Sequence, residues 1–188
     1  NSKYIDKTVI STEDQNIAKI CKKFGGDVPF LRPRELARDN TKIISVILNV
    51  LENIKDDFSI LVLLQPTSPL RLSSDIDSCL DLMVRKKAPS CISICKSAKP
   101  IDWHFKLSEG GKIRKVFPKN ILSTNRQDFA KSYIPNGAIY AAHSKWLKLN
   151  NSFFHNATLG YEMPQERSID IDDKIDFGFA EFLMQNSY

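Results

Sequence analysis

The fold is decided by the stretch Ile60-Leu61-Val62-Leu63-Leu64-Gln65-Pro66-Thr67-Ser68-Pro69-Leu70-Arg71. Its apolar run, 60–64, is typical of a strand packed on both faces, as in the centre of a parallel sheet. The two prolines then prevent both continued strand pairing and an immediate helix. Ligands of open α/β sheets bind at the carboxyl ends of strands, so we expect the loop to face a polar substrate through Gln65, Thr67, Ser68 and Arg71. The alternative is an ordinary buried strand followed by a proline turn.

Extended and helical segments alternate along the chain, which predicts α/β layers. We expect strands at 8–11, 28–31, 60–64, 90–95 and 134–142, and helices at 13–24, 41–54, 74–84 and 173–185. Ser74 is the expected cap of the third helix. The last helix should point Ile175, Phe179, Phe182 and Leu183 inward. Residues 97–133 differ in character, and Gly110-Gly111 predicts a hairpin there.

Composition narrows the classes of function. A net charge of +5 suits an anionic ligand, but the basic residues are scattered and do not alternate with aromatic residues as in nucleic-acid-binding surfaces. The four cysteines have no CxxC spacing and are predicted to be free thiols in a reducing cytoplasm. Neither a membrane span nor a signal peptide is expected. The three histidines lie in dissimilar contexts, so we expect surface or structural roles for them.

Asp170 and Asp172 are the best candidates for metal binding. In an extended segment, residues two apart point to the same face. Mg²⁺ accepts one or two protein carboxylates and completes its octahedron with water and phosphate oxygens. The alternative is that Asp172 or Asp173 caps the last helix, and Asp173 is the better candidate for that role.

Five segments together resemble the acylneuraminate cytidylyltransferases, the CMP-sialic acid synthetase family. They are 9–14 (Val-Ile-Ser-Thr-Glu-Asp), 30–37 (Phe-Leu-Arg-Pro-Arg-Glu-Leu-Ala), 63–71, 135–140 (Pro-Asn-Gly-Ala-Ile-Tyr) and 168–172 (Ser-Ile-Asp-Ile-Asp). The resemblance covers nearly all of the chain. It implies transfer of a cytidylyl group from CTP to a nine-carbon acidic sugar, with Mg²⁺ or Mn²⁺ and release of pyrophosphate.

The resemblance also implies an architecture. The expected fold is a three-layer α/β fold with a mostly parallel sheet, nucleotide-diphospho-sugar transferase-like (Rossmann-like). Residues 1–188 would form a single nucleotidyltransferase domain, and an inserted hairpin at about 97–133 would make a homodimer. Family members open with a strand and a glycine-rich phosphate loop, so we expect this domain to be N-terminally incomplete and activity to need that loop.

The resemblance assigns roles to particular residues. Asp170 and Asp172 would bind the metal and act in catalysis. The nucleotide would be bound by Arg32, Asp39 and Thr41, and the sugar by Gln65, Arg126, Asn136, Tyr140, Phe153 and Phe154. Arg126 would pair with the sugar carboxylate. Ile43 and Ile134 depart from the family pattern, which leaves base contacts beyond Thr41 and the identity of the acidic sugar open.

Each assignment has a plainer alternative. Arg32 could be a solvent-facing strand end, Asn136-Gly137 a turn, and Tyr140 a core residue. Phe153 and Phe154 should face opposite sides, either reaching a neighbouring subunit's sugar pocket or packing within one subunit. Alternative functions are a synthetase for legionaminic or pseudaminic acid or for an eight-carbon sugar acid, a non-catalytic nucleotide-sugar binding module, and a basic nucleic-acid binder.

Overall fold

Four strands form the central sheet of the computed structural model, which describes residues 2–54, 56–117 and 129–186. Their order is β1 (Ile60–Leu63), β5 (Tyr133–His143), β2 (Ser90–Lys96) and β6 (Leu159–Glu162). β5 runs antiparallel to both β1 and β2, whereas β2 and β6 are parallel. The sheet is therefore mixed: β1, β2 and β6 run in one direction and β5 in the other. This agrees with the predicted α/β class.

Two hydrophobic cores lie on opposite faces of the sheet. Helix α3 (Ser73–Arg85) packs on the face that carries Ile60, Val62 and Leu64. Helices α2 (Ile43–Asn53) and α4 (Ser144–Asn150) pack on the other face, against Leu61 and Leu63. Since side chains alternate along a strand, the run 60–64 supplies both cores. The three-layer architecture and the two-sided packing of this strand are confirmed.

The central position expected for the strand at 60–64 is wrong. In the described part of the sheet, β1 lies at the edge, and its ladder partner is the antiparallel strand β5. Its four residues are half-buried. A continuous apolar run reports that helices cover both faces of a strand, but it does not say which strands lie beside it.

The strands predicted at 8–11 and 28–31 are wrong, since neither segment forms a strand. Two backbone hydrogen bonds join this part of the chain, from Ile10 N to Asp27 O (2.8 Å) and from Arg32 N to Thr12 O (2.9 Å). Pro29 lies between these bonds and has no N–H to donate, which interrupts a regular ladder. The two parts of the chain are therefore joined by isolated backbone bonds and not by a strand pairing.

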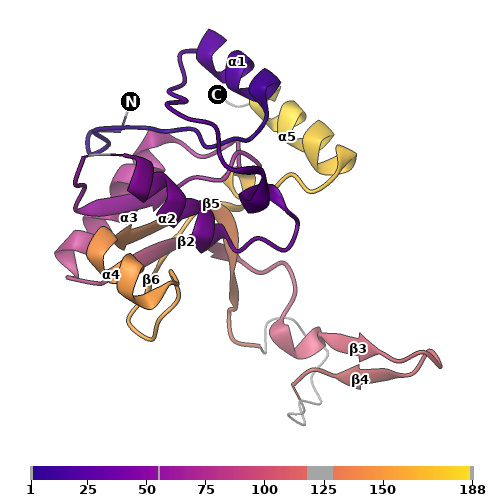
Figure 1. Cartoon of the computed structure of the whole chain (residues 1–188). Coiled ribbons are helices and arrows are strands. Elements are labelled where there is room, and N and C mark those ends of the chain that lie inside the picture. The colour runs from indigo at the N-terminus through magenta and orange to yellow at the C-terminus, as the bar shows by residue number, and fades with distance from the viewer. Residues whose placement is uncertain (1, 55, 118–128, 187–188) are drawn as a thin grey trace.

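Helices α1 (Gln15–Lys23) and α5 (Lys174–Asn186) lie outside the packed layers, at the top of Figure 1. The inward packing predicted for α5 is wrong: Ile175, Phe179 and Phe182 are 80%, 50% and 58% exposed, and Leu183 is half-buried. Apolar residues occur almost all round this helix. The periodicity therefore identifies a helix without selecting one buried face.

The predicted hairpin is confirmed. Strands β3 (Phe105–Leu107) and β4 (Ile113–Lys115) pair in an antiparallel fashion and project from the body of the molecule (Figure 1). Gly111 takes a positive φ of 75° in the connecting turn, a conformation that glycine adopts without steric cost. Three short 3₁₀ segments complete the described structure: Arg34–Ala37, Ile101–Trp103 and Gln165–Arg167.

The start of α3 is tied to the stretch of chain that leads into Asp170 and Asp172. Asp75, only 1% exposed, accepts hydrogen bonds from Arg167 Nε (3.0 Å), Arg167 Nη2 (2.8 Å) and Tyr161 Oη (3.2 Å). It also accepts from the Leu72 N–H (2.9 Å), so α3 begins at Ser73 and the predicted cap at Ser74 is wrong. Burial alone would raise the pKa of Asp75, but the bonds from Arg167 and Leu72 outweigh it and lower the pKa.

The cysteines are free, as predicted: Cys79, Cys91 and Cys95 are buried and Cys21 is half-buried. Hydrogen bonding to Cys91 and burial raise the pKa of the Cys79 thiol, so it stays protonated and unreactive. None of the described helices is long and apolar enough to cross a membrane.

We predict that Asp75→Ala lowers the free energy of unfolding by about 2 to 3 kcal/mol, because it breaks a buried charge pair whose Arg167 partner can still reach water. Urea denaturation measures this loss. The control is Asp81→Ala on the same helix, where a 51% exposed side chain pairs with Lys3 and the loss should stay below about 1 kcal/mol.

The Asp75 contribution should also depend on pH. A lowered pKa means that ionised Asp75 stabilises the fold above its ordinary value of 3.8 and that this stabilisation is lost as the pH falls through the folded value. The difference between wild type and Asp75→Ala should therefore be constant near neutral pH and shrink below pH 3.8. Equal losses for Asp75→Ala and Asp81→Ala would contradict this account.

Candidate active site

One edge of the sheet gathers segments that are far apart in the sequence. β1, β2 and β6 share a direction, so their carboxyl ends meet at this edge. β5 runs the other way and brings Asn136-Gly137 to it. A backbone bond from Ile171 N to Thr67 O (2.9 Å) then fastens the acidic segment to the loop after β1. The ligand position predicted from the 60–71 stretch is therefore where the other candidate segments converge.

A wide bulge in β5 shapes this edge. Along β2, Ile94 pairs with Pro135 and Ile92 with Tyr140, so several residues of β5 lie opposite one residue of β2. Ser93 closes the bulge: its hydroxyl donates to Asn136 Oδ1 (2.5 Å) and accepts from Ile139 N (2.8 Å). Bulges redirect the chain and re-aim side chains next to functional sites. The turn expected at Asn136-Gly137 is this bulge.

Gly137 lies at the centre of the cluster. A Cβ at this position would come within 2.7 Å of Gln65 Oε1 and within 3.1 Å of both Asp170 Oδ2 and Ser68 Oγ. Its φ of 75° also disfavours any residue with a side chain. The absence of a side chain thus lets two polar side chains of the predicted site, Gln65 and Asp170, approach the same stretch of backbone.

Arg71 holds the loop from inside. Its Nη1 donates to three carbonyl oxygens, those of Gln65 (2.9 Å), Ser68 (2.9 Å) and Ala138 (3.2 Å). Burial lowers the pKa of this guanidinium, and the three carbonyl groups satisfy the donors of Nη1. We expected Arg71 to face the substrate, but it binds the protein's own backbone and fixes the loop to β5.

Asn136 is also committed to the protein. It is 4% exposed, and its amide nitrogen donates to Ser168 Oγ (2.8 Å) while its Oδ1 accepts from Ser93. The side chain therefore links β5 to β2 and to the segment before Asp170. These contacts favour a supporting role, and its direct contact with sugar stays a prediction.

The acidic segment separates into two kinds of residue. Asp173 caps α5 as predicted, accepting from Ile175 N (2.7 Å) and Asp176 N (3.0 Å). Asp170 is half-buried, and its Oδ1 is buried without a hydrogen-bond partner, whereas Asp172 is exposed. Within residues 2–54, 56–117 and 129–186, no three His, Cys, Asp or Glu side chains group as metal ligands. Two carboxylates with one unpartnered oxygen fit a hard cation such as Mg²⁺, which needs one or two protein ligands.

Aromatic residues border the acidic segment. The Tyr140 ring lies 5.5 Å from Phe153 and 6.3 Å from Phe154, measured between centroids. Burial and the charge of nearby Asp170 raise the pKa of Tyr140. Phe153 is 5% exposed and packs in the core beside α2 and α4, whereas Phe154 is 57% exposed. The prediction that one ring packs inward and the other is exposed is confirmed, although both rings lie beside Tyr140.

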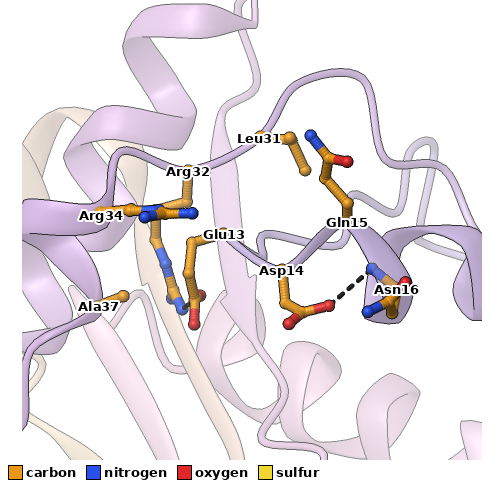
Figure 2. A pocket seen from close by; sticks show the side chains of 8 residues that line it. All are labelled: Glu13, Asp14, Gln15, Asn16, Leu31, Arg32, Arg34 and Ala37. Carbon is orange, nitrogen blue, oxygen red and sulfur yellow. Dashed lines mark hydrogen bonds and ion pairs between the residues drawn. The ribbon is translucent and has the colours of Figure 1, made fainter.

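Arg32 lies in a pocket of about 660 Å³ (Figure 2). The pocket is lined by Glu13, Asp14, Gln15, Asn16, Leu31, Arg32, Arg34 and Ala37. Arg32 Nη2 donates to Glu13 Oε2 at 2.5 Å. Arg32 is therefore a half-buried pocket residue and not a solvent-facing strand end. Glu13 was missed as a site residue in the sequence, although it lies in one of the five family-like segments.

The remaining predicted residues are less defined by the structure. The turn after Arg32 is closed by a bond from Thr41 N to Arg38 O (2.9 Å), and Asp39 is exposed on it. Neither Asp39 nor Thr41 lines the pocket. Arg126, the predicted partner of the sugar carboxylate, lies outside the described residues.

Solved structures share this fold. That of CMP:2-keto-3-deoxy-manno-octonic acid synthetase complexed with CTP matches with a TM-score of 0.67 at 14% sequence identity, covering 100% of this chain and 84% of that chain. At this identity the likeness concerns the fold alone. The chain has the nucleotide-sugar transferase-like fold.

Sequence comparison supplies the family. A model of the family described as cytidylyltransferase matches residues 1–188. N-acylneuraminate cytidylyltransferase of Escherichia coli O18:K1:H7 is 32% identical over 98% of this chain, which spans 43% of that protein. CMP-N,N'-diacetyllegionaminic acid synthase of Campylobacter jejuni serotype O:2 is 32% identical over 98% of this chain and 79% of that protein. The chain belongs to the cytidylyltransferase family, which confirms the resemblance found in the sequence.

We predict that Gly137→Ala destabilises the protein more than Gly111→Ala. Both glycines have a φ of 75°, so both substitutions carry a backbone cost of about 1 kcal/mol. A Cβ at Gly111 meets nothing within 4 Å, whereas one at Gly137 meets Gln65, Ser68 and Asp170. Overpacking adds about 1 to 3 kcal/mol at Gly137. Urea denaturation of the two variants measures the difference. Equal losses in the free energy of unfolding would show that the side chains around Gly137 can accommodate a methyl group.

Proposed function

We propose that this protein activates a nonulosonic acid with CTP, forming the CMP-sugar and pyrophosphate. The observation that carries the proposal is the convergence of Gln65, Ser68 and Asp170 around the side-chain-free backbone of Gly137, with Tyr140 close to Asp170. The names of the two relatives support a nine-carbon acidic sugar as the acceptor.

The reaction joins one oxygen to one phosphorus. The hydroxyl on the anomeric carbon of the sugar attacks the α-phosphorus of CTP, the bond to the β-phosphate oxygen breaks, and pyrophosphate leaves. Such a transfer depends on alignment and charge neutralisation and needs no covalent nucleophile. Bound Mg²⁺ or Mn²⁺ would neutralise phosphate charge and favour ionisation of the attacking hydroxyl.

The chain's own residues would divide this work. Asp170 and Asp172 would hold the cation, Asp170 through the oxygen that has no partner within the protein. Arg32, with the turn at Asp39 and Thr41, would bind the nucleotide. Gln65 and Tyr140 would line the sugar site, supported by Asn136 and bordered by Phe154, and Arg126 would pair with the sugar carboxylate.

Other acidic sugars as substrates, and a non-catalytic binding function, are the alternatives to be tested. Legionaminic acid and pseudaminic acid share the nine-carbon skeleton, and an eight-carbon sugar acid is the more distant choice. A non-catalytic module would bind a CMP-sugar without turning over CTP. Pyrophosphate release across a panel of these acids, measured with the full-length protein, distinguishes all of them.

We also propose a homodimer that uses the β3–β4 hairpin. The pairing of Leu107 with Ile113 places these two residues and Phe105 on one face of the hairpin, at 74%, 62% and 46% exposure. Exposed apolar patches on a projecting element are typical of subunit contacts. A cytoplasmic location suits both CTP and the free cysteines.

Asp170→Asn and Asp172→Asn should each lower the rate of pyrophosphate release about 100-fold or more, because each removes a charge that would hold the cation at the phosphates. The control is Asp173→Asn, which alters charge one residue away but keeps an amino acid that caps α5. The control should remain within about two-fold of wild type. Full activity in the first two variants would rule out the metal role.

The double variant Leu107→Lys with Ile113→Lys should shift the protein from dimer to monomer, because it places two charges in the apolar face of the hairpin. Size-exclusion chromatography with light scattering gives the mass. Leu149→Lys is the control: Leu149 is 82% exposed on α4, away from the hairpin, and its substitution should leave the mass unchanged. A dimer that survives the double variant would place the interface elsewhere.

A further inference from the structure

The ion pair between Glu13 and Arg32 is the part of the pocket that the proposed function leaves unused. Arg32 Nη2 donates to Glu13 Oε2, and the side chains are 33% and 20% exposed for Glu13 and Arg32. Figure 2 shows both residues among the side chains that line the pocket. The pair joins the start of α1 to the segment that leads into Arg34–Ala37.

The backbone on both sides of Glu13 is held in place. Thr12 O accepts the Arg32 N–H at 2.9 Å, so the two segments are fastened together next to the ion pair. Asp14 caps α1 by accepting from Asn16 N (2.6 Å) and Ile17 N (2.9 Å). Glu13 is thus a carboxylate on a fixed point of the chain, which can define where a longer and more flexible arginine side chain lies.

Glu13 holds one end of the Arg32 guanidinium, but another of its hydrogen-bond donors has no partner. Its Nε is buried and has no hydrogen-bond partner, which is costly for a donor unless a ligand or a small rearrangement supplies an acceptor. The guanidinium presents its donors in a rigid fork, so fixing one end of the fork fixes the direction of the others. A carboxylate at Nη2 therefore selects one orientation of the whole group.

The charges around the pocket fit a neutral group better than a phosphate. Its charged lining residues are Glu13, Asp14, Arg32 and Arg34, two of each sign. The hydrogen bond from Arg32 lowers the pKa of Glu13, so the pair is ionised and internally neutralised at neutral pH. Oriented donors with little net charge suit the carbonyl oxygen and ring nitrogen of a pyrimidine.

We propose that Glu13 is a positioning residue that holds the Arg32 guanidinium in the orientation in which it contacts the base of the nucleotide. This inference rests on the proposed function, in which Arg32 binds the nucleotide. Glu13 acts through Arg32 and makes no contact with the nucleotide itself.

The test is a double-mutant cycle on the full-length protein, with CMP and pyrophosphate as the probes in calorimetric binding. Glu13→Gln should weaken CMP binding about ten-fold, since it replaces a charge-assisted bond with a neutral one. Pyrophosphate binding should be unchanged, because pyrophosphate has no base. Glu13→Asp keeps the charge and should restore part of the affinity. The control is Glu52→Gln, which alters an exposed carboxylate on α2 outside the pocket and should bind CMP as wild type does.

The second half of the cycle separates positioning from direct contact. Arg32→Ala should weaken CMP binding, and adding Glu13→Gln to it should change the affinity by less than about two-fold, because two residues acting through one interaction are not additive. A full ten-fold loss in the double variant would mean that Glu13 contacts the nucleotide itself, which overturns the inference. Unchanged CMP binding in Glu13→Gln alone would also overturn it.

The same binding experiments give a different result if the proposed function itself is wrong. If Arg32→Ala binds CMP as wild type does, Arg32 does not bind the nucleotide, and Glu13 then has no positioning role either. If Glu13→Gln weakens CMP and pyrophosphate equally, the substitution acts on the fold, and the inference is overturned while the role of Arg32 stands.

Discussion

The candidate site depends on one close approach, that of the Gly137 backbone to Gln65, Ser68 and Asp170. A single added carbon at Gly137 would fall within 3.1 Å of a polar atom from each of these side chains. The approach requires the bulge in β5, which Ser93 closes. It thereby joins three segments that lie far apart in the sequence.

Buried polar side chains support this approach from behind. Arg71 binds backbone carbonyls on both the loop after β1 and β5, and Asn136 connects the bulge to Ser168. On the far side, Asp75 holds Arg167. Asn136 and Asp75 are 4% and 1% exposed, so removing one of their partners would leave a buried polar group unsatisfied, which costs more than an exposed hydrogen bond contributes. The geometry of the site is therefore maintained by groups that need not touch a substrate.

Much of the fold was predictable because periodicity is a local signal. The run 60–64 alternates between two cores, and the helices at 15–23, 43–53, 73–85 and 174–186 begin and end within a few residues of their predicted bounds. Long-range properties were not predictable in this way. The order of strands, the edge position of β1 and the exposure of α5 all depend on which elements lie beside one another, and no local pattern encodes that.

The candidate site was likewise predictable only where the signal was local. Asp170, Gln65, Tyr140 and Arg32 were identified from short family-like segments, and the structure brings the first three together. Arg71 was expected to face the substrate, because a cationic residue in a loop gives no sign that three carbonyl groups of its own protein surround it. Glu13 and Asp75 were missed for a related reason: their importance lies in a partner 19 or 92 residues away.

The two halves of the site rest on different kinds of structure, and this has a functional consequence. The cluster around Gly137 is built on strands whose inner residues are fully buried, such as Ala138 and Ile139. The Arg32 pocket belongs to the segment 8–37, which is joined by isolated backbone bonds and in which few side chains are buried. Segments with few buried contacts open at lower free energy than core strands. In the proposed reaction, the sugar and cation would therefore meet a rigid surface, while the base would meet the more adaptable one. An ion pair that fixes the Arg32 guanidinium matters most in such a segment, because few buried side chains pack around it.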